Sequence, residues 1–131
     1  MEELFNLGIS LTTLSSMYEL NPEIKEMSNI EVKEKIDMLK LIKCSDSQII
    51  NIISSNSIFL NKTREEYLEL INYLTRLDFN NLNILFDSNP YILNLEPFEI
   101  ENYINKKKQN GKLLEDIVDE LDSNPYLFDE I

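Results

Sequence analysis

A short phrase that recurs along the chain organises this sequence. Residues 88–93 read Ser-Asn-Pro-Tyr-Ile-Leu, and residues 123–128 read Ser-Asn-Pro-Tyr-Leu-Phe. Fainter copies stand at residues 20–24 and 55–60, so the asparagines of the four copies are 35, 33 and 35 residues apart. A regular period in this range is typical of helical repeat proteins, in which similar units stack on one another.

Apolar positions keep the same period. Two sets of residues recur at steps of 35: Leu4, Leu39 and Leu74, and then Ile9, Cys44 and Phe79. This register divides the chain into units of about 4–38, 39–73, 74–108 and 109–131, which we interpret as a single repeat domain over residues 1–131. Because Cys44 shares its register with two apolar residues, we expect its thiol to lie in the core.

Each unit is predicted to begin with a helix that ends at the phrase. The expected helix starts in the four copies are Ser10, Ser45, near Asn80 and near Gly111. Apolar residues follow at helical spacing, and in the last copy these are Leu114, Ile117, Val118 and Leu121. The helix ends at the Asn-Pro step because proline lacks a backbone donor and moves the preceding residue out of helical geometry. The short apolar tail that follows predicts a 3₁₀ turn.

A second helix is predicted six residues after the proline position. Start signals recur there in three copies: Ser28 with Glu31, Thr63 with Glu66, and Glu96 followed by Pro97. The residues expected to be buried are Val32, Ile36 and Leu39, then Leu68, Ile71 and Leu74, then Ile100, Tyr103 and Ile104. The pattern predicts an all-α fold, a right- or left-handed α-solenoid of about three and a half helix, 3₁₀ turn, helix repeats of 33–35 residues.

The last unit is expected to hold a first helix and a phrase but no second helix. Terminal repeats need a polar outer face. The carboxylates that could supply this face are Glu115, Asp116, Asp119, Glu120 and Asp122. A partner, either another copy or a different protein, is the alternative cover for the same edge.

A unit of helix, proline-ended turn and second helix resembles the repeat of the mitochondrial transcription termination factor family. Pro22, Pro90 and Pro125 match the proline of that repeat, and Ser57 replaces it in the second copy. The resemblance implies a curved α-solenoid whose basic groove binds duplex DNA or structured RNA. The Asn, Ile, Lys and Glu content indicates an AT-rich bacterial genome, so the chain would be a distant bacterial member.

The charge of the chain bears on this implied function. A net charge of −12, from 24 acidic and 12 basic residues, repels phosphate backbones unless basic residues gather locally. Eight of the basic residues fall in the middle of the chain: Lys40, Lys43, Lys62, Arg64, Arg76, Lys106, Lys107 and Lys108. They are the candidate contacts for nucleic acid or a protein partner. The lysines at 106–108 also suit the C-terminal end of a helix, where they complement the helix dipole.

Five tyrosines could act as stacking platforms for bases. They are Tyr67, Tyr73, Tyr91, Tyr103 and Tyr126. Most of them lie in apolar register, so we expect most to be core residues.

Catalytic chemistry is poorly represented. The chain has no histidine, two glycines and one cysteine, which excludes histidine-based nucleophile arrangements, a glycine-rich phosphate loop and a multi-cysteine zinc site within one chain. We therefore predict a protein that is not an enzyme and needs no metal or cofactor. An acidic N-terminus and the lack of a long apolar run predict a cytoplasmic protein that does not bind membranes.

These observations lead to three hypotheses of function. The leading one is a non-catalytic, acidic α-helical repeat protein that binds another protein. The alternative is nucleic-acid binding through the central basic residues. A further alternative is an acidic mimic of DNA that inhibits a DNA-binding enzyme.

Overall fold

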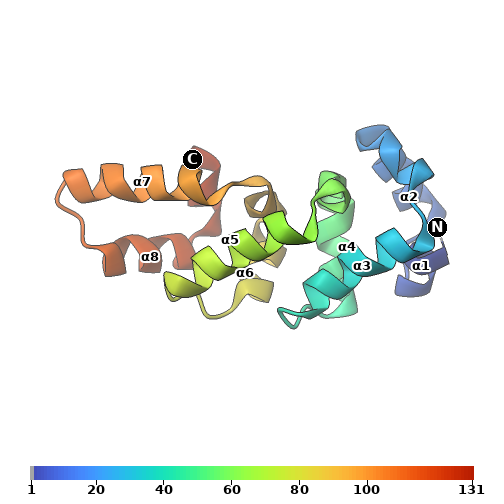
Figure 1. Cartoon of the computed structure of the whole chain (residues 1–131), viewed down its shortest axis with the longest axis horizontal. Helices are drawn as coiled ribbons and strands as arrows, with labels where there is room; N and C mark the ends of the chain where they lie inside the picture. Colours follow the sequence, from blue (N-terminus) through green and yellow to red (C-terminus); the bar gives the residue numbers. More distant parts are fainter. Residues whose placement is uncertain (1) are drawn as a thin grey trace. The chain divides into compact units, whose positions relative to one another are not determined.

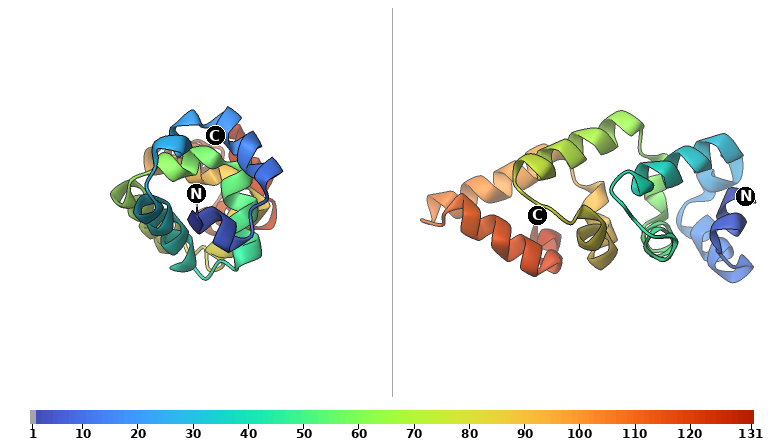
Figure 2. Two further views of the ribbon diagram at one scale, coloured as in Figure 1. Left: turned by 90° about the vertical axis from the view of Figure 1, so that its right-hand side faces the viewer. Right: turned by 90° about the horizontal axis from the view of Figure 1, so that it is seen from below.

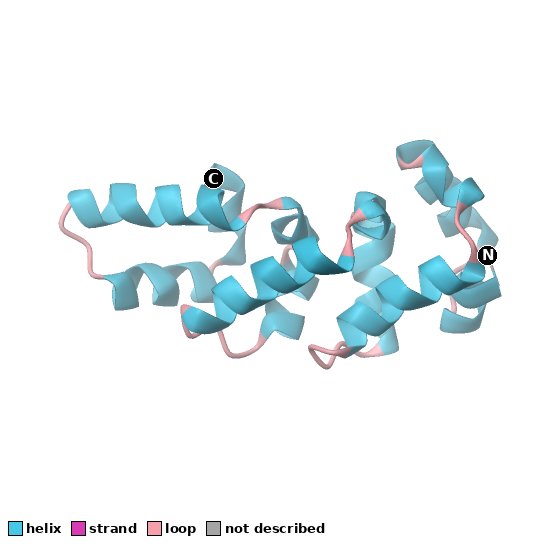
Figure 3. Ribbon diagram, viewed as in Figure 1, coloured by secondary structure: helices cyan, strands magenta, loops and turns pink. Residues whose placement is uncertain are grey.

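The computed structural model describes residues 2–131 and is all-α over that range, with no strand among those residues (Figures 1 and 3). The α-helices are α1 (Glu2–Leu7), α2 (Leu11–Leu20), α3 (Asn29–Lys40), α4 (Asp46–Ser55), α5 (Arg64–Arg76), α6 (Leu82–Ser88), α7 (Pro97–Gln109) and α8 (Leu114–Ser123). The 3₁₀ helices are η1 (Pro22–Glu26), η2 (Ser57–Asn61), η3 (Pro90–Asn94) and η4 (Pro125–Glu130). The predicted order of first helix, 3₁₀ turn and second helix is confirmed in three copies, and the fourth holds α8 and η4.

The predicted helix starts are confirmed where side chains cap the helix. Ser10 accepts a hydrogen bond from the Thr13 N–H at the start of α2. Ser28 and Ser45 each form a capping box with the residue three positions later, and this pair of bonds satisfies backbone groups that the first turn leaves free. Pro97 occupies the first turn of α7, as predicted.

All four first helices end at the asparagine of the phrase. Asn21, Asn56, Asn89 and Asn124 have φ between −144° and −131° and ψ between 68° and 87°, outside the helical region. Three of them precede proline, which disfavours the helical region for the residue before it. Asn56 adopts it before Ser57, and η2 still forms. The turn therefore does not depend on the proline.

A left-handed residue ends four of the helices at equivalent positions. Gly8, Lys43, Asp78 and Gly111 have φ of 114°, 69°, 72° and 91°. The N–H of the next residue donates back across the last turn each time, from Ile9, Cys44, Phe79 and Lys112 to the carbonyl oxygens of Leu4, Leu39, Leu74 and Lys107. This is the Schellman pattern of helix ends. The two sets of apolar residues that recur at steps of 35 in the sequence are therefore the donors and the acceptors of this hydrogen bond.

The left-handed residues bear on the two other predicted helix starts. Gly111 belongs to the end of α7, so the N-cap of α8 is Leu113, two residues beyond the start predicted near Gly111. Asp78 has the same role after α5, and α6 has its N-cap at Asn81, which agrees with the start predicted near Asn80.

The chain divides into two compact units, Met1–Arg64 and Glu65–Ile131. In the first, α1 contacts α3, and α2 contacts both α4 and η2. In the second, α7 lies beside α8 in two views (Figures 1 and 2), and η4 contacts both α6 and η3. Each unit thus packs elements of neighbouring copies against each other. The solenoid and the single domain stay predictions.

The core confirms much of the predicted burial. Cys44 is buried, as are the stripe of isoleucines in α4 and, in α8, Ile117, Val118 and Leu121. Phe79 and Phe128 meet in the core of the second unit with their ring centroids 6.0 Å apart.

Several predicted core residues lie elsewhere. Leu114 is 38% exposed, at the first turn of α8. In α5 the buried positions are Tyr67, Leu70 and Leu74, so the stripe predicted from Leu68 and Ile71 was one residue out of phase.

The tyrosine prediction was wrong for Tyr91 and Tyr126, which are 56% and 66% exposed. Both occupy the second position of a 3₁₀ turn. With about three residues per turn, only one side of this short helix faces the core. In η3 that side carries Ile92 and Leu93, which are buried. Tyr91 consequently points away from the core.

Candidate functional site

The eight predicted basic residues fall into two groups. Most lie at or just after the C-terminal ends of the longer helices: Lys40 and Lys43 with α3, Arg76 with α5, and Lys106, Lys107 and Lys108 with α7. Lys62 ends η2 just before α5, and Arg64 is the first residue of α5. The structure therefore does not bring all eight to one helix end.

None of the eight forms an ion pair within the described part of the chain; the two ion pairs found there are Lys33–Asp37 and Lys112–Glu120. Two of the eight stack on aromatic rings instead. The Arg76 guanidinium lies 6.0 Å from the centroid of the Tyr73 ring, and the Lys107 ammonium lies 5.3 Å from that of Tyr103.

The 3₁₀ turns of the second unit present a pair of exposed aromatic side chains. Tyr91 and Tyr126 hold the same position in η3 and η4, and these turns contact each other. Neither phenol hydroxyl makes a hydrogen bond within residues 2–131. We call the surface that Tyr91 and Tyr126 form on η3 and η4 the tyrosine face.

A buried asparagine fixes the two turns of the tyrosine face against each other. The Asn89 side-chain amide donates to the Pro125 carbonyl oxygen and to the Asp129 carboxylate, each at 3.0 Å. The Asn89 side-chain oxygen accepts from the Tyr91 N–H at 3.3 Å. Asn89 itself is 2% exposed, so its side-chain amide would be costly to leave without partners, although the bonds it makes are only part-buried.

The same bonds recur in the first unit. The Asn21 side-chain amide donates to the Ser57 carbonyl oxygen at 3.0 Å and to the Asn61 side-chain oxygen at 3.1 Å. The Asn61 amide donates back to Asn21 at 3.3 Å. In both units the first acceptor belongs to the residue that follows the phrase asparagine of the next copy. The second acceptor lies four residues after the first. The asparagine thus links one turn to the next.

Sequence reasoning assigned the phrase to its proline and missed this asparagine. The signal was present, because asparagine stands in all four copies whereas Ser57 replaces proline in one. Ser57 also carries a buried hydroxyl that has no hydrogen-bond partner.

The end of the second unit formed by α7, α8 and η4 is polar. We call it the α7–α8 end. The Lys112 ammonium and the Glu120 carboxylate are 3.0 Å apart. This hydrogen bond, and then the charge of its partner, raises the pKa of Lys112 and lowers the pKa of Glu120.

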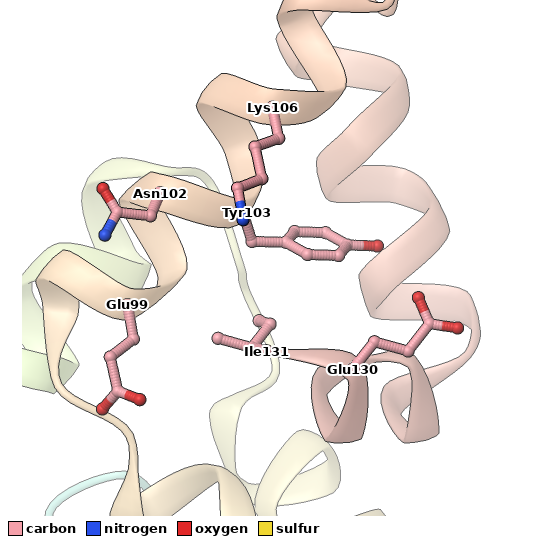
Figure 4. A pocket seen from close by; sticks show the side chains of 6 residues that line it. All are labelled: Glu99, Asn102, Tyr103, Lys106, Glu130 and Ile131. Carbon is pink, nitrogen blue, oxygen red and sulfur yellow. The ribbon is translucent and has the colours of Figure 1, made fainter.

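A shallow pocket of about 270 Å³ opens on this end. Figure 4 shows the Tyr103 ring reaching from α7 toward α8, with Lys106 above it and Glu130 and Ile131 below. Partial burial raises the pKa of the Tyr103 phenol, and the negative charges of Glu130 and Glu120 raise it further.

Charged residues at this end occupy positions that are apolar in the preceding copy. The helix-end hydrogen bonds align Lys107 with Leu74 and Lys112 with Phe79, and the phrase asparagines Asn89 and Asn124 align Glu120 with Leu85. All three apolar residues are buried, with exposures of 0%, 3% and 2%. The charged replacements are what a terminal repeat needs on its outer side. They support one of the two alternatives drawn from the sequence, a polar cover built from the chain itself.

The remaining sites of potential chemistry are few. Within the described residues no group of three cysteine, aspartate or glutamate side chains is placed to hold a metal ion. No helix in that range is long and apolar enough to cross a membrane.

Comparison with known proteins does not assign the chain to a family. No protein-family model matches the chain, and no curated protein or solved structure does so either. The resemblance to the transcription termination factor repeat therefore stays a prediction.

Proposed function

We propose that this chain is an α-solenoid that acts as a non-catalytic protein-interaction module and contacts its partner through the tyrosine face. The solenoid part of the proposal is supported by the contacts between neighbouring copies inside each unit. Asn21 and Asn89 make equivalent bonds in the two units, which is how a repeated stacking step would be held.

The observation that carries the interaction proposal is the exposure of Tyr91 and Tyr126. Ile58 holds the same position in the second copy and is 55% exposed, so three copies keep an apolar or aromatic side chain in water. The first copy has Glu23 there, which shows that the turn itself accepts a charged residue. Tyrosine is enriched at protein interfaces because it offers a large apolar ring and a hydroxyl that needs a partner.

A paired-variant experiment tests the tyrosine face. The double variant Tyr91→Ser/Tyr126→Ser should keep the helical circular dichroism of the wild type and lose the proteins that bind it, measured by quantitative mass spectrometry of affinity eluates. The control is Ile84→Ser, which alters another exposed apolar residue, 54% exposed, on α6. Recovery of the same proteins with the wild type and the double variant would refute the proposal.

Nucleic-acid binding is the second candidate, and the lack of ion pairs at all eight predicted basic residues favours it. Unpaired lysines and arginines remain available for phosphates, and their binding would weaken as salt rises. Fluorescence anisotropy with duplex DNA and with single-stranded RNA at low salt tests this. An absence of binding under those conditions removes the candidate. The DNA-mimic alternative is tested by adding the protein to nuclease assays.

A further inference from the structure

A pocket of about 390 Å³ lies in the second unit, between the end of α5 and the first two turns of α8. Its apolar wall is formed by Leu77, Leu114 and Val118, and Leu114 is 38% exposed. The polar residues of its rim are Arg76, Asp78, Asn80, Glu115 and Asp119. An apolar wall with a few polar groups around it is the usual composition of a binding site. We call this site the α5–α8 pocket.

The rim of the α5–α8 pocket is acidic. Asp78, Glu115 and Asp119 supply three carboxylates against the single positive charge of Arg76, whose guanidinium lies over the Tyr73 ring. Within residues 2–131 none of the three carboxylates makes a side-chain hydrogen bond or an ion pair. They are therefore available to a positively charged ligand. Phosphate backbones and anionic membranes have the wrong sign of charge for this rim.

The first unit has an equivalent place without these charges. There α4 lies against the end of α1, because a methyl group added to Gly8 would lie 3.5 Å from the Ile50 Cδ1 atom. The left-handed helix ends and the phrase asparagines give the corresponding residues, which are Asp78 and Gly8, Glu115 and Ser47, and Asp119 and Asn51. A first helix can thus pack against a helix end with no carboxylate at these three positions. The acidic rim belongs to the second unit and is not a requirement of the packing.

Asp78 occupies its position at a cost to the stability of the fold. Its φ of 72° is a left-handed conformation that glycine adopts with less strain, as Gly8 and Gly111 do at the equivalent helix ends. It also follows the last turn of α5, where the helix dipole disfavours a negative charge and favours a positive one such as Lys43 has after α3. Residues that are kept in an unfavourable conformation beside a pocket are typical of ligand sites.

The α5–α8 pocket is distinct from the two surfaces described above. Asp116 and Glu120 lie on the side of α8 that faces Lys112, and Glu120 pairs with Lys112 at 3.0 Å. In contrast, Glu115 and Asp119 face the end of α5. Among the described residues, none from η3 or η4 lines the pocket, so the tyrosine face is not part of it.

We propose that the α5–α8 pocket binds a basic segment of a partner protein. An apolar side chain of that segment lies against the apolar wall, and the lysine or arginine side chains on either side of it pair with the three carboxylates of the rim. Opposite charges on the two surfaces steer association and select the partner. This inference goes beyond the proposed function, because it assigns a second surface and the chemistry of its ligand, and it does not depend on the tyrosine face.

Fluorescence anisotropy of labelled peptides, titrated with the whole chain, tests the proposal. The probe is the peptide Gly-Lys-Lys-Leu-Leu-Lys-Lys-Gly, and two further peptides carry serine in place of leucine or glutamate in place of lysine. The probe should bind more tightly than either of these, and its affinity should fall as salt is added. An absence of binding would overturn the proposal. Equal affinity for the serine peptide would also overturn it, because attraction to the net charge of the chain would then be sufficient.

Two matched double variants locate the contact on α8. Glu115→Gln/Asp119→Asn should raise the Kd of the probe peptide by about fivefold to tenfold. The control Asp116→Asn/Glu120→Gln removes one aspartate and one glutamate at the same spacing from the other side of α8, and should change the Kd by less than about twofold. Both variants lower the net charge of the chain by the same amount. Equal effects on the Kd would therefore contradict the assignment of the peptide to the pocket.

Asp78→Gly separates binding from stability. It removes a carboxylate of the rim and relieves the left-handed backbone, so it should raise the Kd of the probe peptide by about threefold in a chain that is more stable than the wild type. Loss of the fold cannot explain such a result, and an unchanged Kd would contradict the proposal. Tyr91→Ser/Tyr126→Ser should bind the peptide as the wild type does, which keeps this test separate from that of the tyrosine face.

Discussion

The side-chain amide of Asn89 donates to the backbone carbonyl oxygen of Pro125, 36 residues further along the chain, at 3.0 Å. Asn21 makes the corresponding bond to Ser57 over the same separation. The acceptor is a backbone carbonyl oxygen, which every residue type has. This explains why serine and proline can both stand at the acceptor position. The donor is a side-chain amide, so its position needs a particular residue type, and that residue is asparagine in every copy.

The first prediction compares two asparagines of the phrase. Asn89→Ala removes two part-buried hydrogen bonds, from the Tyr91 N–H and to the Pro125 carbonyl oxygen, so it should lower the free energy of unfolding by about 1–2 kcal/mol. Asn124→Ala removes an exposed amide that bonds to nothing in its own chain, and should change it by less than about 0.5 kcal/mol. Urea titrations of both variants and the wild type measure the two changes. Equal losses from the two variants would contradict the assigned role of Asn89.

The second prediction concerns Ser57, which stands where the other copies have proline. The preceding Asn56 has backbone angles close to those of the asparagines that precede proline in the other copies, and the Ser57 hydroxyl is buried without a partner. Ser57→Pro should therefore raise the free energy of unfolding by about 0.5–1 kcal/mol, because it restricts the unfolded chain and removes the unpaired hydroxyl. Ser57→Ala is the control that removes the hydroxyl alone. If both variants gain equally, the backbone restriction contributes nothing.

The parts of the fold that sequence predicts well depend on neighbours in the chain. Ser28 and Glu31 form a capping box three residues apart, and the Asn-Pro step acts on adjacent residues. Such local rules located most helix boundaries. The link from Asn21 to Ser57 joins residues 36 apart and depends on how the turns pack, which no local rule contains.

The candidate site was harder to predict for the same reason. An apolar register placed Tyr91 and Tyr126 in the core, but a 3₁₀ turn buries only one of its sides, and the tyrosines lie on the other. The charged residues of the α7–α8 end were visible in the sequence as Lys107, Lys112 and Glu120. To recognise them as replacements for buried apolar residues, one has to align the end of α7 with the end of α5. The equivalent Schellman bonds at the two helix ends supply that alignment.

The third prediction exploits the left-handed helix ends. Asp78 has φ of 72°, a conformation that costs L-residues free energy but costs glycine almost none. Asp78→Gly should raise the free energy of unfolding by about 0.5–1 kcal/mol. The reverse change, Gly111→Ala, should lower it by about 1 kcal/mol. No atom lies within 4 Å of the added methyl group, so the loss reports the backbone alone. Thermal denaturation of both variants measures the difference, and a loss from Asp78→Gly would contradict the assignment.

The fourth prediction uses the pH dependence of the Lys112–Glu120 pair. The hydrogen bond from Lys112 lowers the pKa of Glu120 in the folded protein. A carboxyl group with a lowered pKa stabilises the fold above its unfolded pKa, and this contribution is lost as the pH falls through the folded pKa. The urea midpoint of the wild type should therefore exceed that of Glu120→Gln at neutral pH, and the two should converge in acid. A difference that persists in acid would show that Glu120 acts through packing rather than charge.

The fifth prediction tests why the α7–α8 end is charged. Replacing its three charged residues by the apolar residues of the preceding copy gives the variant Lys107→Leu/Lys112→Phe/Glu120→Leu. An end built from residues that are buried elsewhere in the chain exposes a contiguous apolar surface, which promotes association. The variant should self-associate more strongly than the wild type, and added salt should not weaken this association, because the hydrophobic contribution is not screened. Sedimentation velocity at two salt concentrations measures both effects. The single substitution Lys108→Leu, one residue along α7 at an exposed position, is the matched control and should sediment as the wild type does. A triple variant that stays as monomeric as the wild type would mean that these three positions do not face the next copy, and the register that assigns them to the seam between repeats would be wrong at this end.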